Sequence, residues 1–107
     1  MRVKSNWRFV VLAFAILFVT ITASAADQKT QDLYKSRCQG CHGADGKATS
    51  VGKKLGAKDF QEPDVANASQ ADLVKITSEG KGKMPAYKGK LTDEQIADLV
   101  TCVKGLK

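Results

Sequence analysis

The segment CQGCH, residues 38–42, places two cysteines and the only histidine of the 107-residue chain within five positions. Two thiols three residues apart lie about one helical turn from each other, and the histidine follows directly. Side chains in this pattern hold zinc, carry out thiol redox chemistry, or attach a haem covalently. Each possibility requires different surroundings, so the rest of the chain must distinguish them.

The chain begins with a segment typical of secretory signal peptides. Residues 1–8 carry three basic and no acidic residues, the thirteen residues 9–21 are apolar apart from one threonine, and A-S-A follows at 23–25. The apolar run is shorter than the roughly 18–20 residues of a membrane-spanning helix, although an uncleaved membrane anchor is the alternative. We therefore predict a signal peptide over 1–25, a single domain over 26–107, and export to the periplasm.

The predicted mature chain is small and mildly basic. It has 82 residues, with 14 basic against 11 acidic side chains and a net charge of +3. The basic residues are spread along the chain, which argues against nucleic-acid binding. A domain of this size is near the lower limit for folding around its own core, and its only aromatic residues are Tyr34, Phe60 and Tyr87. We expect a disulfide, a metal or a bulky cofactor to supply additional buried area.

The first predicted helix leads into the cysteine–histidine segment. A helix is predicted from Gln28 to Gln39, with Asp27 as its N-cap, and it presents the cysteines at its C-terminal end, where Gly40 and Gly43 end it. Residues 43–67 show no periodicity and predict a long irregular loop with one short helical turn. A loop of this length in a small domain is typically functional, and wrapping a cofactor would explain it.

Two further helices are predicted in the second half of the chain. One runs from Gln70 to Glu79 after Ser69 as N-cap. The other begins after Thr92, with Gln95 completing a capping box. Its apolar stripe consists of Ile96, Leu99, Val100 and Val103. No strand pattern is present, so the expected fold class is all-α, with three main helices and long loops.

The cysteine–histidine segment matches C-x-x-C-H, the attachment signature of c-type haem. A zinc site usually needs four ligands. Cys102 is the only other thiol of the chain, and there is no second histidine that could serve as a ligand. A thioredoxin-like site needs a βαβ context, which is not visible. The histidine after the second cysteine and the export signal both favour haem, with zinc and thiol redox chemistry as the alternatives.

A bound haem would need a second axial ligand for its iron. His42 and Met84 are the only histidine and methionine of the mature chain, so two histidines from one chain cannot bind the iron. Met84 lies in the glycine- and lysine-rich loop 80–91, and histidine with methionine is a known axial pair. We predict Met84 as the second ligand, with Lys81, Lys83 or an open position as the alternatives.

With these residues in place, the chain resembles the small monohaem class I cytochromes c of bacterial and photosynthetic type. The resemblance rests on CQGCHGADGK at 38–47 and on GKGKMPAYKGKLTDEQIADLVTCVKGLK at 80–107, and it extends over essentially all of 26–107. It implies a class I cytochrome c fold wrapped around one covalently attached haem c. The implied haem-binding residues are Cys38 and Cys41 as thioethers, and His42 and Met84 as iron ligands.

The resemblance also implies finer contacts. The first and last helices would cross, with Tyr34 and Leu99 at the contact. Gly52 and Lys53 stand where many relatives have Gly-Pro, and the backbone carbonyl after the glycine would accept the second N–H of the iron-binding histidine. Cys102 stands where relatives usually have an aromatic residue. Its spacing from Leu99 indicates a small buried apolar side chain, and an intermolecular disulfide or redox sensor is the alternative.

The function that follows is electron transfer without catalysis. An iron with both axial positions filled has no site for a substrate, so the resemblance implies a soluble monomeric carrier that cycles between Fe(III) and Fe(II) in a respiratory or photosynthetic chain. The expected partners are acidic or membrane-bound redox proteins, steered by lysines in the two loops at positions 47, 53, 54, 81, 83, 88 and 90. The alternatives are a haem sensor or enzyme subunit with an open distal position, a subunit docked on a larger oxidoreductase, and a zinc-binding module.

Overall fold

The computed structural model describes residues 25–106. The predicted signal peptide, apart from its last residue, lies outside the described residues. Between residues 25 and 106 there is no helix with the length and apolar character needed to span a membrane. The helices in this part of the chain are α1 (Ala25–Arg37), α2 (Gln39–His42), α3 (Ser50–Lys54), α4 (Pro63–Ala66), α5 (Gln70–Glu79) and α6 (Asp93–Gly105).

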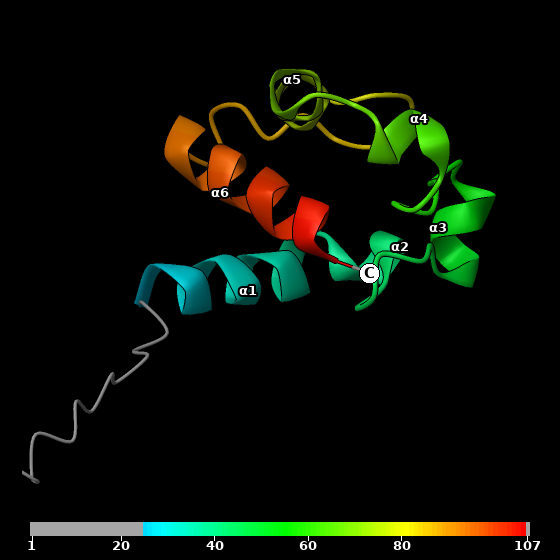
Figure 1. The fold of residues 1–107 in the computed structure, drawn as a ribbon, viewed down its shortest axis with the longest axis horizontal. Helices are drawn as coiled ribbons and strands as arrows, with labels where there is room; N and C mark the ends of the chain where they lie inside the picture. Colours follow the sequence, from blue (N-terminus) through cyan, green and yellow to red (C-terminus); the bar gives the residue numbers. More distant parts are fainter. Residues whose placement is uncertain (1–24, 107) are drawn as a thin grey trace, which may run out of the picture.

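The all-α prediction is confirmed. In the described residues the only extended pairings are two isolated bridges, Lys81 with Met84 and Lys88 with Leu91. The three longest helices, α1, α5 and α6, correspond to the three main helices expected from the sequence. The remaining helices are short and lie between α1 and α5 along the chain, where the sequence predicts mostly loop (Figure 1).

The prediction of the first helix is wrong in its start and its end. Helix α1 begins before Gln28, and the helical segment breaks at Cys38 before continuing as α2. The backbone of Cys38 keeps a helical ψ of −39°, but its φ of −118° is far from the helical value. Gly40 lies inside α2 and does not end it. Gly43 does end α2, because its φ of 75° is one that glycine adopts without strain.

The loop over 43–67 contains two short helices, not the single turn predicted. Helix α3 begins after Thr49, whose side chain accepts a hydrogen bond from the Gly52 amide at 3.0 Å. Helix α4 starts with Pro63, which has the right φ for a first helical position and no amide hydrogen to leave unpaired. Both helices have recognisable start signals, although each is too short to show periodicity.

The predicted caps of α5 and α6 are confirmed. The Asp72 amide donates to Ser69 Oγ over 3.1 Å at the start of α5. At the start of α6 the Gln95 amide donates to Thr92 Oγ1 over 3.1 Å, and the Thr92 amide donates to Gln95 Oε1 over 2.9 Å. These reciprocal bonds form the capping box.

Helix α6 lies between α1 and α5 and carries the centre of the core (Figure 1). Ile96 is fully buried, and Leu99 and Val100 are nearly so, as the apolar stripe predicts. Tyr34 on α1 is also buried, in agreement with the expected packing of the first and last helices. The buried apolar residues of the described chain are few: Tyr34, Ala48, Tyr87, Ile96, Leu99 and Val100.

Candidate functional site

The break between α1 and α2 brings the two cysteines and the histidine onto one helical turn. The Cys41 and His42 amides both donate to the Cys38 carbonyl, at 3.2 and 2.9 Å. All three side chains are half-buried. Burial, aided by the neighbouring Cys102, raises the pKa of the Cys38 thiol to about 11, and burial lowers the pKa of the His42 imidazole. The Cys38 thiol is therefore protonated and the His42 imidazole is neutral at physiological pH.

The three cysteines of the described chain form no disulfide with one another. Cys102 is half-buried on α6, as its helical spacing predicts, and burial raises the pKa of its thiol. Across residues 25–106 no three side chains among His, Cys, Asp and Glu are grouped closely enough to hold a metal ion. The four-ligand zinc site considered from the sequence is therefore not formed in this part of the chain.

Thr49 joins the cysteine–histidine turn to α3. Its amide donates to the Cys41 carbonyl over 3.0 Å, and its hydroxyl donates to the Gly40 carbonyl over 2.8 Å. Gly52 packs directly on this turn, since a Cβ built on it would lie 2.0 Å from the Cys41 carbonyl oxygen. Neither contact was predicted. A threonine as N-cap was the only local signal that could have indicated Thr49.

Two buried tyrosines hold the backbone on either side of the cysteine–histidine turn. Tyr34 Oη donates to the Gly43 carbonyl over 2.6 Å, and Tyr87 Oη donates to the Arg37 carbonyl over 3.0 Å. Burial raises the pKa of Tyr34 to about 12 and also raises the pKa of Tyr87. Both hydroxyls therefore remain protonated donors at physiological pH. Tyr34 attaches α1 to the residue that ends α2, and Tyr87 attaches the loop before α6 to the end of α1.

The surroundings of His42 differ from those implied by the resemblance. Its Nδ1 atom is buried and has no hydrogen-bond partner. The Lys53 carbonyl, which follows Gly52, accepts from the Gly56 amide over 3.1 Å at the end of α3. The expected hydrogen bond from the histidine to this carbonyl is therefore not formed. The ring of Phe60 instead stacks on the imidazole, with centroids 4.8 Å apart and planes inclined by 26°.

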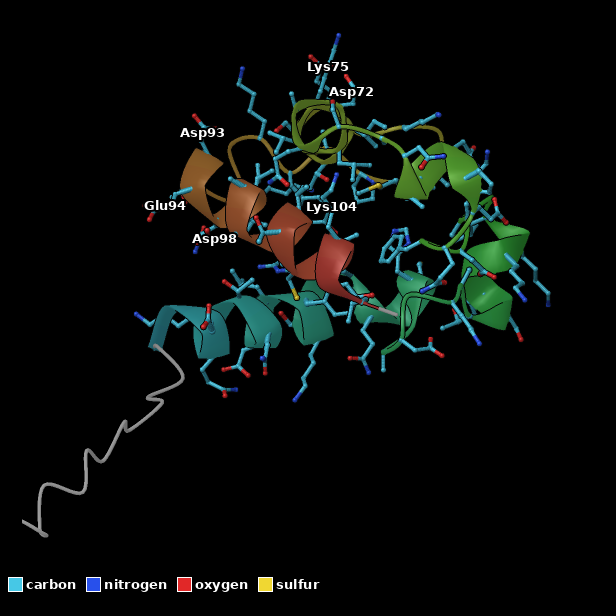
Figure 2. The ribbon with its side chains drawn as sticks, viewed as in Figure 1. Asp72, Lys75, Asp93, Glu94, Asp98 and Lys104 are labelled. Atoms are coloured by element: carbon cyan, nitrogen blue, oxygen red, sulfur yellow. The ribbon has the colours of Figure 1, made fainter. Side chains whose placement is uncertain are left out.

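A cavity of about 280 Å³ adjoins this stack. Its walls come from the segment at Phe60 and from α4, α5 and α6, and the lining residues are Phe60, Gln61, Val65, Ala66, Leu73, Val103, Lys104 and Leu106. Lys104, seen on α6 in Figure 2, closes one side by donating to the Ala68 carbonyl over 2.7 Å. A mostly apolar cavity, a half-buried imidazole whose Nδ1 is buried without a partner, and two thiols on the same turn fit a large flat apolar group that is attached through sulfur.

Met84 lies on a separate, well-ordered turn between α5 and α6. Its amide donates to the Lys81 carbonyl over 2.9 Å and its carbonyl accepts from the Lys81 amide over 3.1 Å. Gly80 leaves room for this turn, because a Cβ there would lie 2.7 Å from the Met84 carbonyl oxygen. The Tyr87 amide donates to the Thr77 carbonyl and ties the turn back to α5. The backbone of Met84 is thus held firmly, and its side chain is half-buried.

Known proteins resemble this chain over most of its length. The model of the family described as cytochrome c oxidase, cbb3-type, subunit III matches residues 25–101. Cytochrome c6 of Porphyra purpurea is 32% identical over 96 residues, which cover 89% of this chain and 86% of the relative. Cytochrome c6 of Thermostichus vulcanus is 35% identical over 101 residues, which cover 90% and 88%.

A solved structure gives the same likeness in three dimensions. The KustC0563 c-type cytochrome superposes with a TM-score of 0.68 at 35% identity, covering 73% of this chain and 96% of that one. The helical fold and the C-x-x-C-H turn beside an apolar cavity define a protein that attaches haem covalently. Together with these likenesses, they show that the chain belongs to the cytochrome c family as a small monohaem class I member. It carries a covalently bound haem c with its iron and is an electron carrier.

Proposed function

We propose that this chain is a periplasmic one-electron carrier in a respiratory or photosynthetic chain. In this proposal Cys38 and Cys41 hold the haem by thioethers, and His42 and Met84 bind its iron. The observation that carries the proposal is the turn at residues 38–42, where two thiols lie beside a neutral imidazole, and the ring stacked on that imidazole, Phe60, lines an apolar cavity. The haem supplies an iron that gains and loses one electron, and no substrate is bound or released.

The residues of the chain serve this function by orientation and exclusion of water. The short α2 helix fixes the spacing of the two thiols, and Thr49 with Tyr34 fixes its backbone. The apolar cavity walls favour the less charged state of a redox centre, because burial penalises charge. A methionine thioether is a soft ligand that favours the reduced state further, so we expect a high potential for the His42–Met84 pair.

The attachment is tested with serine variants of the three cysteines. We expect the protein with Cys38→Ser and Cys41→Ser together to lose its haem on a denaturing gel, because no sulfur remains to hold it. Cys102→Ser is the matched control and should retain haem as the unaltered protein does. Haem retained by the double variant, or lost with Cys102→Ser, would contradict the assignment.

The second axial ligand is tested by the visible spectrum of the oxidised protein. We expect the weak long-wavelength band that accompanies methionine–iron ligation, and we expect Met84→Ala to abolish it. The variant should also bind carbon monoxide in its reduced form, because one axial position becomes open. Lys81→Ala and Lys83→Ala are controls that leave the band unchanged. Rapid carbon monoxide binding by the unaltered protein would favour the haem-sensor alternative.

Exposed lysines support an acidic or membrane-bound redox partner. The side chains at 47, 53, 54, 81, 83, 88 and 90 are all exposed in the structure. We expect electron exchange with an acidic partner to slow as ionic strength rises, because salt screens long-range attraction. Lys53→Gln with Lys54→Gln should weaken this salt dependence, whereas Lys75→Gln, which projects outward from α5 in Figure 2, should not. A rate independent of salt would remove the steering proposal.

One finding favours a second candidate function. The matching family model is described as a subunit of cytochrome c oxidase, which favours a permanent attachment to a larger oxidoreductase as the alternative. Purification of the native protein distinguishes the two. Release as a monomer by a salt wash supports the mobile carrier, and stoichiometric co-purification with integral membrane subunits supports the oxidase subunit.

A further inference from the structure

The ring of Phe60 covers one face of the His42 imidazole. The two ring centroids are 4.8 Å apart and the planes are inclined by only 26°. A stacked neighbour of this kind occupies the face of the imidazole and leaves the ring edge, where the nitrogen atoms lie, free to bind. The stack therefore restricts rotation of the imidazole without blocking its nitrogen.

Phe60 is itself held in place by the loop that directly follows His42. Its amide donates to the Gly46 carbonyl over 2.9 Å. Gly46 has a φ of 80°, and a Cβ on it would lie 2.7 Å from Phe60 Cδ2, so the ring packs directly on the glycine backbone. The neighbouring Asp59 accepts from the Ala48 amide over 2.8 Å. These contacts prevent the aromatic ring from swinging away from the imidazole.

His42 lacks the hydrogen bond that usually orients a metal-binding histidine. Such a histidine generally donates its second N–H to a carbonyl or carboxylate, which sets the ring orientation and the basicity of the ligand. Here Nδ1 is buried without a partner, and the Lys53 carbonyl bonds to the Gly56 amide. Something other than a hydrogen bond must therefore orient the ring.

The geometry points to Phe60 as a positioning residue for His42: its stacked ring sets the rotation of the imidazole. Phe60 supplies a rigid flat surface from a segment 18 residues further along the chain. The inference rests on the proposed function, because it assumes that His42 binds the iron. It assigns to Phe60 a contribution to the redox potential in addition to its contribution to packing.

The test uses the full haem-loaded protein and two variants of Phe60. In the oxidised protein, the spread of the haem methyl proton shifts reports the orientation of the axial ligand rings. We expect Phe60→Leu to change this spread and to shift the midpoint potential, because leucine has no flat face to hold the rotation of the imidazole and the orientation of a ligand tunes the metal. Phe60→Tyr retains a stacking ring and should keep both values close to those of the unaltered protein.

Ile96→Val is the matched control, since Ile96 is fully buried in the core on α6 and is not among the residues that line the cavity. This variant should lower the melting temperature and leave the shift pattern unchanged. An unchanged pattern and potential in Phe60→Leu would overturn the inference. Should Phe60→Leu fail to fold, the reduced unaltered protein decides: nuclear Overhauser contacts between the Phe60 and His42 rings support the inference, and their absence overturns it.

A failure of the proposed function gives a different experimental result from a failure of the inference about Phe60. If the unaltered protein retains haem on a denaturing gel but Phe60→Leu leaves the shifts unchanged, only the positioning by Phe60 is rejected. If the unaltered protein carries no covalent haem, or if His42 does not bind the iron, the proposed function is rejected first.

Discussion

At the scale of single residues, Gly52 occupies a position where a side chain would collide with the haem-attachment turn. A Cβ there would lie 2.0 Å from the Cys41 carbonyl oxygen and 3.0 Å from Cys41 Cα. We expect Gly52→Ala to lower the free energy of unfolding by about 3 kcal/mol or more, because overpacking forces the backbone of α2 and α3 apart. Denaturant unfolding of the haem-loaded protein measures this.

Gly40 provides the matched control for this substitution. It also lies in a short helix, but a Cβ on it has no neighbour within 4 Å. Gly40→Ala should therefore be neutral or slightly stabilising, since alanine favours a helix over glycine by about 1 kcal/mol. Equal losses in the two variants would contradict the close approach of α2 and α3.

Tyr34 makes stability depend on pH at the alkaline end of the range. Burial is the main reason that the pKa of the Tyr34 phenol in the folded protein rises from the usual 10.0 to about 12. The protein holds this proton more tightly when folded, so the resulting stability is complete below pH 10 and is lost as the pH rises towards 12. We expect the unfolding free energy to fall across this window.

Tyr34→Phe should remove that part of the alkaline loss. At neutral pH the variant should be less stable by about 1 kcal/mol, because the Gly43 carbonyl loses its buried donor. Tyr87→Phe, which loses the hydrogen bond to Arg37, should keep the Tyr34 contribution. Identical pH profiles for Tyr34→Phe and the unaltered protein would show that the phenol does not ionise in this way.

At the scale of elements, α6 depends on its N-terminal cap. The Thr92 hydroxyl accepts from the Gln95 amide, and the Gln95 side chain completes the box. Thr92→Ala should lower the free energy of unfolding by about 1 kcal/mol, and Thr92→Ser should restore nearly all of it. Thermal or denaturant unfolding distinguishes these two variants. Equal stability of the alanine and serine variants would mean that the cap contributes little.

The elements also show where sequence patterns succeed. Helix α5 runs from Gln70 to Glu79 as predicted, because Ser69 and Gly80 are strong local start and stop signals. The break at Cys38 was not predicted, because cysteine has no local preference for it. The turn after Cys38 is instead held by Thr49, which lies eight residues beyond Cys41 and bonds to its carbonyl.

At the scale of the whole molecule, the core is too small for the polypeptide to fold firmly without haem. Only six apolar residues of the described chain are buried, and Ile96 alone is fully buried. We expect the protein made without haem to lose its near-ultraviolet circular dichroism and to unfold at far lower denaturant concentration than the haem-loaded form. Similar unfolding midpoints for the two forms would contradict this dependence.

The sequence by itself determined the fold class, the N-terminal caps of α5 and α6, and the C-x-x-C-H motif. Each of these features depends on residues a few positions apart in the sequence, so that their spacing alone decides which side chains can come into contact. The tertiary structure decided how the site is supported. The hydrogen bond from Tyr87 to Arg37 joins residues 50 positions apart, and the stack of Phe60 on His42 crosses a loop with no periodicity. Such contacts depend on how helices and loops pack together, and no local pattern encodes that packing.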